Sequence, residues 1–273
     1  MVDSLFSLQG KVIVITGAAG LLGRQHADVV ARSGGIPVLL DIHAESIESL
    51  ATDIGRRHGV HAAGYAVDIT CEVAVETNCA TVLSRFDHID GLVNNAANNP
   101  KVEGDGIKCF SRLENFPLSV WEADIAVSLT GAFLCAKHFG GAIARQGGSI
   151  VNISSDLGLI APDQRLYRKP GLPEDQQPVK PVTYSVVKSG LIGLTRYLAT
   201  YWAQEGVRCN ALCPGGVENN QDPAFLKEVI ARVPMGRMAQ PDEYQGALLF
   251  LLSNASSYMN GAVLSVDGGR TCW

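Results

Sequence analysis

Few residues of this sequence are charged, and no block of charge of one sign occurs. Asp, Glu, Lys and Arg make up 18% of the 273 residues, with 22 basic and 27 acidic side chains and a formal net charge of −5. Soluble domains average about 25% charged residues. The low charge favours a compact chain with a buried core. The missing basic patch argues against a nucleic-acid partner.

Long hydrophobic runs, cysteine pairs and metal-ligand spacings are also missing. The densest apolar run, 247–252, is far shorter than the roughly 18 residues of a membrane helix, so we expect no membrane segment. The N-terminal residues have no basic stretch and no long apolar one, so we expect no signal peptide. Seven scattered cysteines are typical of reduced thiols in the cytoplasm. The histidines show no metal spacing, and we expect no metal site.

Glycine is abundant, with 29 residues, and apolar strings alternate with helical patterns along the whole chain. Strands are predicted at 11–16, 36–41, 91–94, 149–154, 208–212 and 262–266, and a shorter one ending at Asp68. Helices are predicted at 21–32, 44–57, 73–85, 120–139, 183–205 and 241–252. This alternation predicts an α/β fold, a doubly wound Rossmann-like parallel sheet of about seven strands with helices on both faces. We expect one domain over 1–273, with a long loop inserted at 156–182.

Three glycines separate the first predicted strand from the first helix. Gly17, Gly20 and Gly23 have the spacing GxxGxxG. Glycines permit a tight turn and a close backbone approach to a pyrophosphate, and the following helix N-terminus supplies free N–H groups. The pattern therefore predicts a dinucleotide site, although three glycines can also merely tighten a turn.

Two acidic residues end predicted strands beside this loop. Asp41 follows Gly23 at a distance where dinucleotide folds place an acid that holds the ribose hydroxyls. Its carboxylate would repel the 2′-phosphate of NADP, so we predict NAD as the cofactor. Asp68 is expected to contact the adenine edge, or else to cap the next helix.

A second group of residues has the chemistry of proton transfer. Tyr184 and Lys188 are four residues apart on one predicted helix face. A lysine beside a phenol lowers the pKa of the phenol, which would give a proton donor and acceptor usable near neutral pH. Ser155 ends a predicted strand at the edge where such sheets place their sites, with its neighbour Ser154 as the alternative.

In combination these motifs resemble the short-chain dehydrogenase/reductase family. TGAAGLLG (16–23), Asp41, Asp68, NNAA (94–97), ISS (153–155), YSVVK (184–188), PGG (214–216) and VDGG (266–269) occur in the family's order. The resemblance implies an NAD(P)-dependent oxidoreductase in which Tyr184 is the general acid/base, Lys188 holds the nicotinamide ribose and Ser155 orients the substrate. It also implies further cofactor contacts from Leu21, Leu22, Ile42, Ile69, Asn95, Ala96, Ala97, Ile153, Pro214, Gly215, Val217 and Asn219.

Three departures from the family pattern stand out. Leu21 takes a position that usually carries glycine. Ser128 takes the place of the family's catalytic Asn, which anchors a water in the proton relay, so Ser128 is the candidate for that role. The gap between Ser155 and Tyr184 is about twice the family's usual length, and the extra residues form the 156–182 loop.

The loop bears on the substrate. With Gln164, Arg165 and Arg168 close together, it favours a polar lid over a small polar substrate such as a carbohydrate, although a solvated loop is the alternative. Together with the missing Asn, the loop is similar to a branch of oxidoreductases of flagellin glycosylation and nonulosonic-acid biosynthesis. A non-catalytic NAD-binding regulator is the alternative function. The family resemblance implies a homotetramer or homodimer.

Overall fold

The structure, a computed structural model, describes residues 2–98 and 111–273. Within these residues seven parallel strands form one sheet in the order β3-β2-β1-β4-β5-β6-β7. The strands are β1 (Val12–Thr16), β2 (Ile36–Asp41), β3 (Ala63–Ala66), β4 (Gly91–Asn94), β5 (Gly148–Ile153), β6 (Val207–Pro214) and β7 (Val263–Val266). The predicted fold class is confirmed. The third strand ends two residues before Asp68, the end expected for it.

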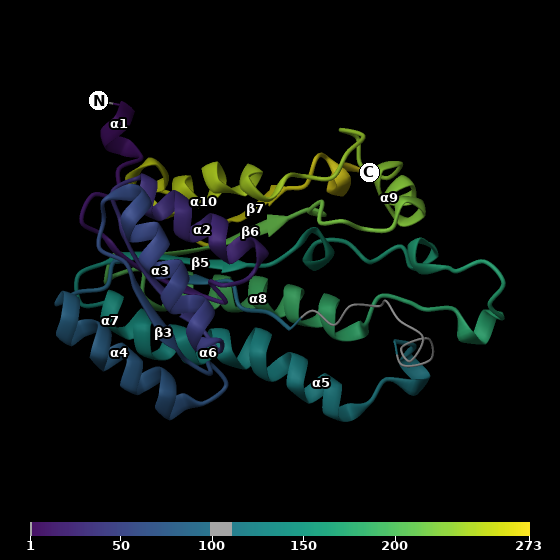
Figure 1. The fold of residues 1–273 in the computed structure, drawn as a ribbon, viewed down its shortest axis with the longest axis horizontal. Helices are drawn as coiled ribbons and strands as arrows, with labels where there is room; N and C mark the ends of the chain where they lie inside the picture. Colours follow the sequence, from purple (N-terminus) through teal and green to yellow (C-terminus); the bar gives the residue numbers. More distant parts are fainter. Residues whose placement is uncertain (1, 99–110) are drawn as a thin grey trace.

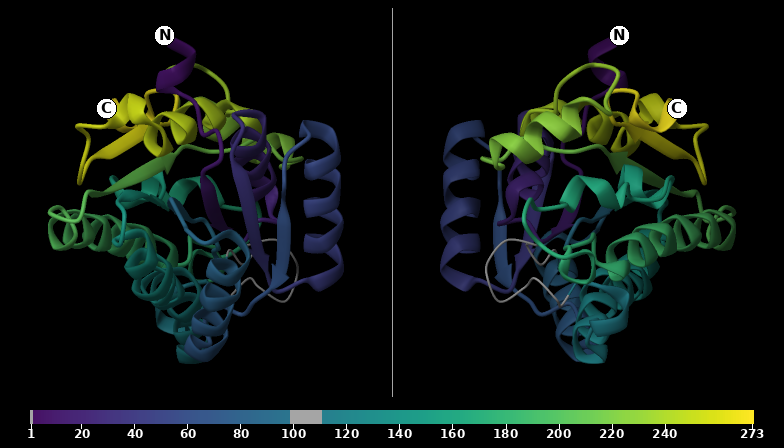
Figure 2. Two further views of the ribbon diagram at one scale, coloured as in Figure 1. Left: turned by 90° about the vertical axis from the view of Figure 1, so that its left-hand side faces the viewer. Right: turned by 90° about the vertical axis from the view of Figure 1, so that its right-hand side faces the viewer.

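Helices cover both faces of the sheet (Figures 1 and 2). On one face lie α2 (Leu21–Arg32), α3 (Ala44–His58) and α10 (Gln245–Leu252). On the other lie α4 (Glu72–Phe86), α8 (Val182–Tyr201) and a composite helix of α5 (Leu118–Ile125), α6 (Gly131–Cys135) and α7 (Gly141–Ile143). Two short helices, α1 (Val2–Leu5) and α9 (Pro223–Ile230), were not expected from the sequence.

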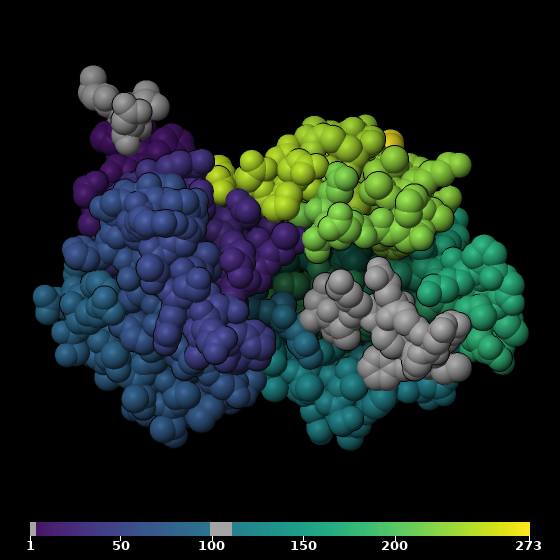
Figure 3. All heavy atoms as spheres, in the orientation of Figure 1, coloured from purple at the N-terminus to yellow at the C-terminus, as the bar shows by residue number. Residues whose placement is uncertain are grey.

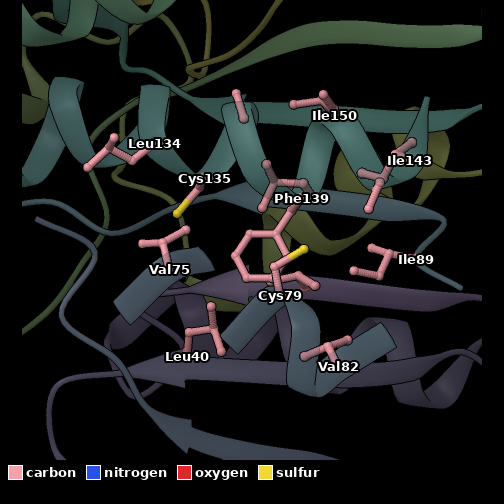
Figure 4. Close-up of a cluster of buried hydrophobic side chains, with 14 of the residues drawn as sticks. Leu40, Val75, Cys79, Val82, Ile89, Leu134, Cys135, Phe139, Ile143 and Ile150 are labelled. Carbon is pink, nitrogen blue, oxygen red and sulfur yellow. The ribbon is translucent and has the colours of Figure 1, made fainter. Parts of the chain in front are cut away.

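The core fills the two spaces between the sheet and its helices. On the α4 side, Phe139 and Cys135 of the composite helix pack against Cys79 and Val82 of α4 (Figure 4). Because both faces are covered, every side chain of β1 and β4 is buried. This explains why these strands are continuously apolar rather than alternating.

The composite helix is unusually apolar. By length and composition alone, Leu118–Ile143 could cross a membrane, but the core helix of a soluble protein passes the same test, so the expectation of no membrane segment stays a prediction. The segment has few charged residues, and polar residues interrupt its apolar ones. Leu134, Cys135 and Phe139 pack it against the sheet, as in the core helix of a globular domain.

The 156–182 segment joins β5 to α8 as expected. It contains three short 3₁₀ turns, Asp156–Gly158, Gln164–Tyr167 and Glu174–Gln176. The chain therefore leaves the sheet beside Ser155 and returns beside Tyr184, at the carboxyl edge of the strands.

Candidate active site

A cavity of about 800 Å³ opens at the carboxyl edge of the sheet. It lies where β1 and β4 are neighbours and the chain turns to opposite sides, which is the usual ligand position in doubly wound sheets. Figure 3 shows the hollow between the purple N-terminal segments and the yellow-green segment that includes α9. The volume falls within the range of small-ligand pockets.

One end of the cavity is formed by the glycine turn. Gly17 has a positive φ of 62°, and a Cβ there would lie 2.7 Å from Ala96 Cα. A Cβ on Gly23 would lie 2.2 Å from Gly17 O, so both positions require glycine. Asn95 Nδ2 donates to Thr16 O and Gly17 O and fixes the turn. The turn leads into α2, a twelve-residue helix whose N-terminal residues Leu21 and Leu22 line the cavity. This bare backbone at a helix N-terminus suits a dinucleotide pyrophosphate.

Asp41 and Asp68 line the same end. The Asp41 carboxylate accepts from Ala19 N at 3.1 Å and from His43 N at 3.3 Å. Asp68 Oδ1 accepts from the backbone and the hydroxyl of Thr70, so this residue also fixes the turn before α4. Arg24, which the sequence analysis did not consider, lines the cavity too, with its Nε bonded to Ala19 O.

Ser155, Tyr184 and Lys188 meet at the other end. Tyr184 Oη donates to Ser155 Oγ at 3.4 Å. Lys188 Nζ lies 5.8 Å from the Tyr184 ring centroid and donates to Ile153 O at 2.9 Å. The Ser154 hydroxyl donates instead to Lys188 O at 2.7 Å. The Ser155 hydroxyl is therefore the one that faces the tyrosine.

The electrostatics of this group differ from the sequence expectation in one respect. Burial raises the pKa of Tyr184, whereas a lowered pKa was expected. Burial also lowers the pKa of Lys188 to about 8. Removing both groups from water disfavours their charged forms, which are the phenolate of Tyr184 and the ammonium of Lys188.

A buried ion pair next to Ser155 was missed by the sequence analysis. Asp156 Oδ1 accepts from Ser155 Oγ at 2.7 Å, and its Oδ2 lies 3.2 Å from Arg270 Nε. Lys180 Nζ lies 3.8 Å from the Tyr184 ring centroid. Lys180 and Arg270 line the cavity. No motif marks these residues, since 114 positions separate the two members of the ion pair along the chain and only the fold brings them together.

Ser128 lies behind the cavity wall. It is buried in a π turn of the composite helix, Ala126–Thr130, and its Oγ accepts from Asn98 N at 3.3 Å. Asp124, one turn earlier, accepts from Asn98 Nδ2 at 2.8 Å and from Thr183 Oγ1 at 2.5 Å. This network holds the start of α8 just before Tyr184. A water held by Ser128 stays a prediction.

Most of the expected site residues lie in the cavity wall. These are Gly17, Gly20, Leu21, Leu22, Asp41, Ile42, Asp68, Ile69, Asn95, Ala96, Ala97, Ile153, Ser155, Tyr184, Lys188, Pro214, Gly215, Val217 and Asn219. Gly23 and Ser128 support the wall from outside it.

The three loop residues expected to form a polar lid, Gln164, Arg165 and Arg168, do not line the cavity. Arg165 pairs with Asp163, and its side chain is 77% exposed, while Arg168 pairs with Glu174. Gln164 Oε1 accepts from Lys180 N. The apolar Leu166 and Tyr167 of the same turn line the cavity instead. The polar-lid expectation for these three residues is therefore corrected, because their charges and amides are bonded within the loop.

Comparisons with known proteins place the chain in a family. A model described as short chain dehydrogenase matches residues 11–167, and one described as Enoyl-(Acyl carrier protein) reductase matches residues 175–271. The chain is 33% identical to D-threitol dehydrogenase of Mycolicibacterium smegmatis, over 99% of this chain and 96% of that protein.

Solved structures agree with this placement. A gluconate 5-dehydrogenase from Burkholderia cenocepacia, in complex with NADP and tartrate, matches all of both chains with a TM-score of 0.87 and 30% identity. An NAD⁺-bound xylitol dehydrogenase matches 96% of this chain and 99% of its own, with a TM-score of 0.83 and 28% identity. The chain belongs to the short-chain dehydrogenase/reductase family and is an oxidoreductase that uses a nicotinamide cofactor. The narrower similarity to flagellin and nonulosonic-acid enzymes is not shown by these comparisons.

Proposed function

We propose that this enzyme transfers a hydride between NAD and an alcohol or ketone carbon of a sugar or polyol. The observation that carries the proposal is the meeting of Ser155, Tyr184 and Lys188 at the cavity end opposite the glycine cradle. The names of relatives that act on threitol, xylitol and gluconate support the substrate class. The same three residues argue against a non-catalytic regulator.

The residues divide the chemistry as follows. A bound nicotinamide supplies the hydride acceptor or donor. When an alcohol is oxidised, its hydroxyl proton passes to Tyr184 Oη as the hydride leaves the carbon. Ser155 orients the substrate oxygen by a hydrogen bond. The Lys188 ammonium favours the phenolate form of Tyr184 and would hold the nicotinamide ribose.

Tyr184→Phe tests this assignment. The variant keeps the ring and removes the proton carrier, so kcat is expected to fall about 10²- to 10⁴-fold. NADH affinity, measured by fluorescence titration, should stay unchanged. Turnover is measured by NADH absorbance with a panel of polyols, aldonates and sugars. A fully active variant would contradict the mechanism.

For the cofactor, Asp41 supports a preference for NAD, because a carboxylate at the ribose repels a 2′-phosphate. Arg24 on the same wall is a feature that favours NADP. We expect the wild-type protein to bind NADH at least about tenfold more tightly than NADPH. Asp41→Ala should weaken NADH binding and reduce the difference between the affinities for NADH and NADPH. Arg24→Ala should leave NADH binding near its wild-type value. Equal affinity of the wild-type protein for NADH and NADPH would contradict the assignment of NAD as the cofactor.

Assembly and location belong to the same proposal. Apolar side chains exposed on the composite helix and α8 support self-association into a homodimer or homotetramer. A cytoplasmic location stays a prediction from the scattered cysteines.

A further inference from the structure

Charges are divided unevenly between the two ends of the cavity. At the adenosine end, the wall carries two carboxylates, Asp41 and Asp68, and one cation, Arg24. At the catalytic end, the described part of the wall carries three cations, Lys180, Lys188 and Arg270, and one carboxylate, Asp156. The catalytic end therefore has an excess of positive charge.

The last residues of the chain are built to place Arg270 there. Asp267 accepts from Gly269 N, from Thr271 N and from the Thr271 hydroxyl. Gly268 and Gly269 both have positive φ values, 65° and 88°, which only glycine adopts easily. The chain turns sharply after β7 and directs the Arg270 side chain, only 11% exposed, toward Asp156.

The ion pair leaves most of the guanidinium unused. Among the residues that the structure describes, the Arg270 guanidinium pairs with one carboxylate, that of Asp156, whose Oδ2 lies 3.2 Å from Nε. The two Nη atoms of a guanidinium form a planar fork that matches carboxylate and phosphate oxygens. A purely structural pair would not need this fork on a cavity wall.

Lys180 adds a second cation without an acidic contact in the described residues. Its ammonium rests on the ring of Tyr184, and its backbone N–H is fixed by Gln164. Burial lowers the pKa of Lys180 to about 8, a cost that a bound anion would relieve. Lys188 is different, because Ile153 O accepts from its ammonium and the proposed function already uses it.

The surroundings strengthen any charge interaction at this end. Leu166, Tyr167, Phe225, Val229 and Met238 line the cavity, and several of them pack together in one apolar cluster. The Tyr167 and Phe225 rings lie 5.8 Å apart. Apolar walls exclude water and raise the strength of a cation–anion contact.

We propose that Arg270 and Lys180 form a subsite for an oxyanion of the substrate, so that the enzyme acts on a polyol that carries a carboxylate or phosphate group. The inference rests on the proposed function for the position of the reacting carbon near Tyr184. The anion itself is recognised by groups outside the proton-transfer machinery, and its binding can be measured without turnover.

Equilibrium binding to the enzyme–NADH complex tests the subsite. The titrants are L-tartrate and L-threitol, which share a four-carbon diol core and differ in their ends, and inorganic phosphate. The wild-type protein should bind tartrate or phosphate at least tenfold more tightly than threitol. Arg270→Gln and Lys180→Met should each weaken the preferred anion about 10- to 100-fold, as expected for a charged hydrogen bond. Threitol binding should change less than about twofold. Tartrate binding without phosphate binding would assign a carboxylate, and the reverse a phosphate.

Two further variants serve as controls. Arg165→Gln removes a cation that is exposed and outside the cavity, and it should leave all three affinities unchanged. Arg270→Gln also leaves Asp156 unpaired, so its thermal stability and NADH affinity are measured first. Arg270→Lys keeps the charge and should retain part of the anion binding. Lys180→Met tests the subsite without breaking the Asp156 pair.

The outcomes separate this inference from the proposed function. Equal wild-type affinity for threitol and both anions would overturn the subsite, as would full anion binding in both Arg270→Gln and Lys180→Met. If the wild type and both variants turned over anionic and neutral polyols at equal rates, the oxidoreductase assignment would stand and the anion subsite would be refuted. If anion binding depended on Arg270 while Tyr184→Phe kept full activity, the proposed mechanism would fall and the subsite would stand.

Discussion

At the scale of single residues, Lys188 is the most constrained charge of the site. It is 5% exposed, its ammonium has one backbone carbonyl as hydrogen-bond partner, and burial lowers its pKa to about 8. The active site needs the ammonium, yet burial makes this charged form of Lys188 less stable than it is in water. Lys188 is therefore expected to support catalysis at the expense of stability, as buried functional groups often do.

This conflict predicts a pH dependence of stability. The unfolded pKa of lysine, about 10.5, lies above the folded value of about 8. Between these values the unfolded chain holds the proton that the folded chain has lost, so the Lys188 contribution to stability rises with pH. Below pH 8 both states are protonated and the full cost is present. Lys188→Met removes this cost, so the variant is expected to be more stable than the wild type at pH 8. The difference between their free energies of unfolding should shrink by up to about 3 kcal/mol between pH 8 and pH 10.5.

The measurement is urea unfolding of both proteins at several pH values. Taking the difference between them cancels the titrating groups that do not interact with Lys188. Lys227→Met, which removes an exposed lysine of α9, is the matched control and should run parallel to wild type. Parallel curves for Lys188→Met as well would show that Lys188 does not carry this pKa shift.

At the scale of elements, the 156–182 loop presents its two sides differently. The charged side chains in the middle of the loop pair with one another and with Arg232, since Asp163 contacts both Arg165 and Arg232, whereas Asp156 and Lys180 at its ends line the cavity. Its apolar side chains Leu166 and Tyr167 turn inward, against α9. The loop therefore closes the cavity by packing rather than by polar contacts from its arginines.

Two variants compare these sides of the loop. Tyr167→Ala removes a half-buried ring that lines the cavity and is expected to raise KM for the polyol substrate at least about tenfold, since contact with such a ring stabilises by a few kcal/mol. Arg165→Ala should leave KM within about twofold, because its side chain is exposed. Steady-state kinetics at saturating cofactor measure both. A raised KM in Arg165→Ala with an unchanged KM in Tyr167→Ala would restore the polar-lid interpretation.

The elements also show which features of the fold and the site could be predicted from the sequence. The glycine turn, Asp41 and the pair Tyr184 and Lys188 could be predicted because each depends on neighbours close in sequence. The strand ends could be placed to within about two residues because both faces of the sheet are apolar. Arg270 and Asp156 could not be paired, since their contact depends on how β7 and β5 lie in the finished sheet. The direction of the Tyr184 pKa shift was missed for the same reason, because it depends on burial.

At the scale of the whole molecule, the composite helix and α8 each expose large apolar side chains. The composite helix exposes Leu118 and Phe133 by 68% and 50%, and α8 exposes Tyr197 and Tyr201 by 61% and 59%. The α5 and α8 segments pack against each other on one face of the sheet. The tyrosine rings stack with centroids 5.6 Å apart and form a ready apolar surface. By contrast, α10 buries Leu248, Leu251 and Leu252 in the core of its own chain.

The surface of the composite helix and α8, rather than that of α10, is therefore the one that we expect to associate. A second copy that packs there would cover the tyrosines, which are enriched in the buried centres of protein interfaces. Tyr201→Lys places a charge on this surface, and burying an unpaired charge in an interface costs several kcal/mol. The variant is expected to shift the assembly to fewer copies in light scattering after gel filtration. Val73→Lys changes an exposed residue of α4 and is the matched control, so this variant should keep the oligomer size of the wild type. A wild-type protein that is monomeric at micromolar concentration would rule out the assembly, and an unchanged size in Tyr201→Lys would move the interface to another surface.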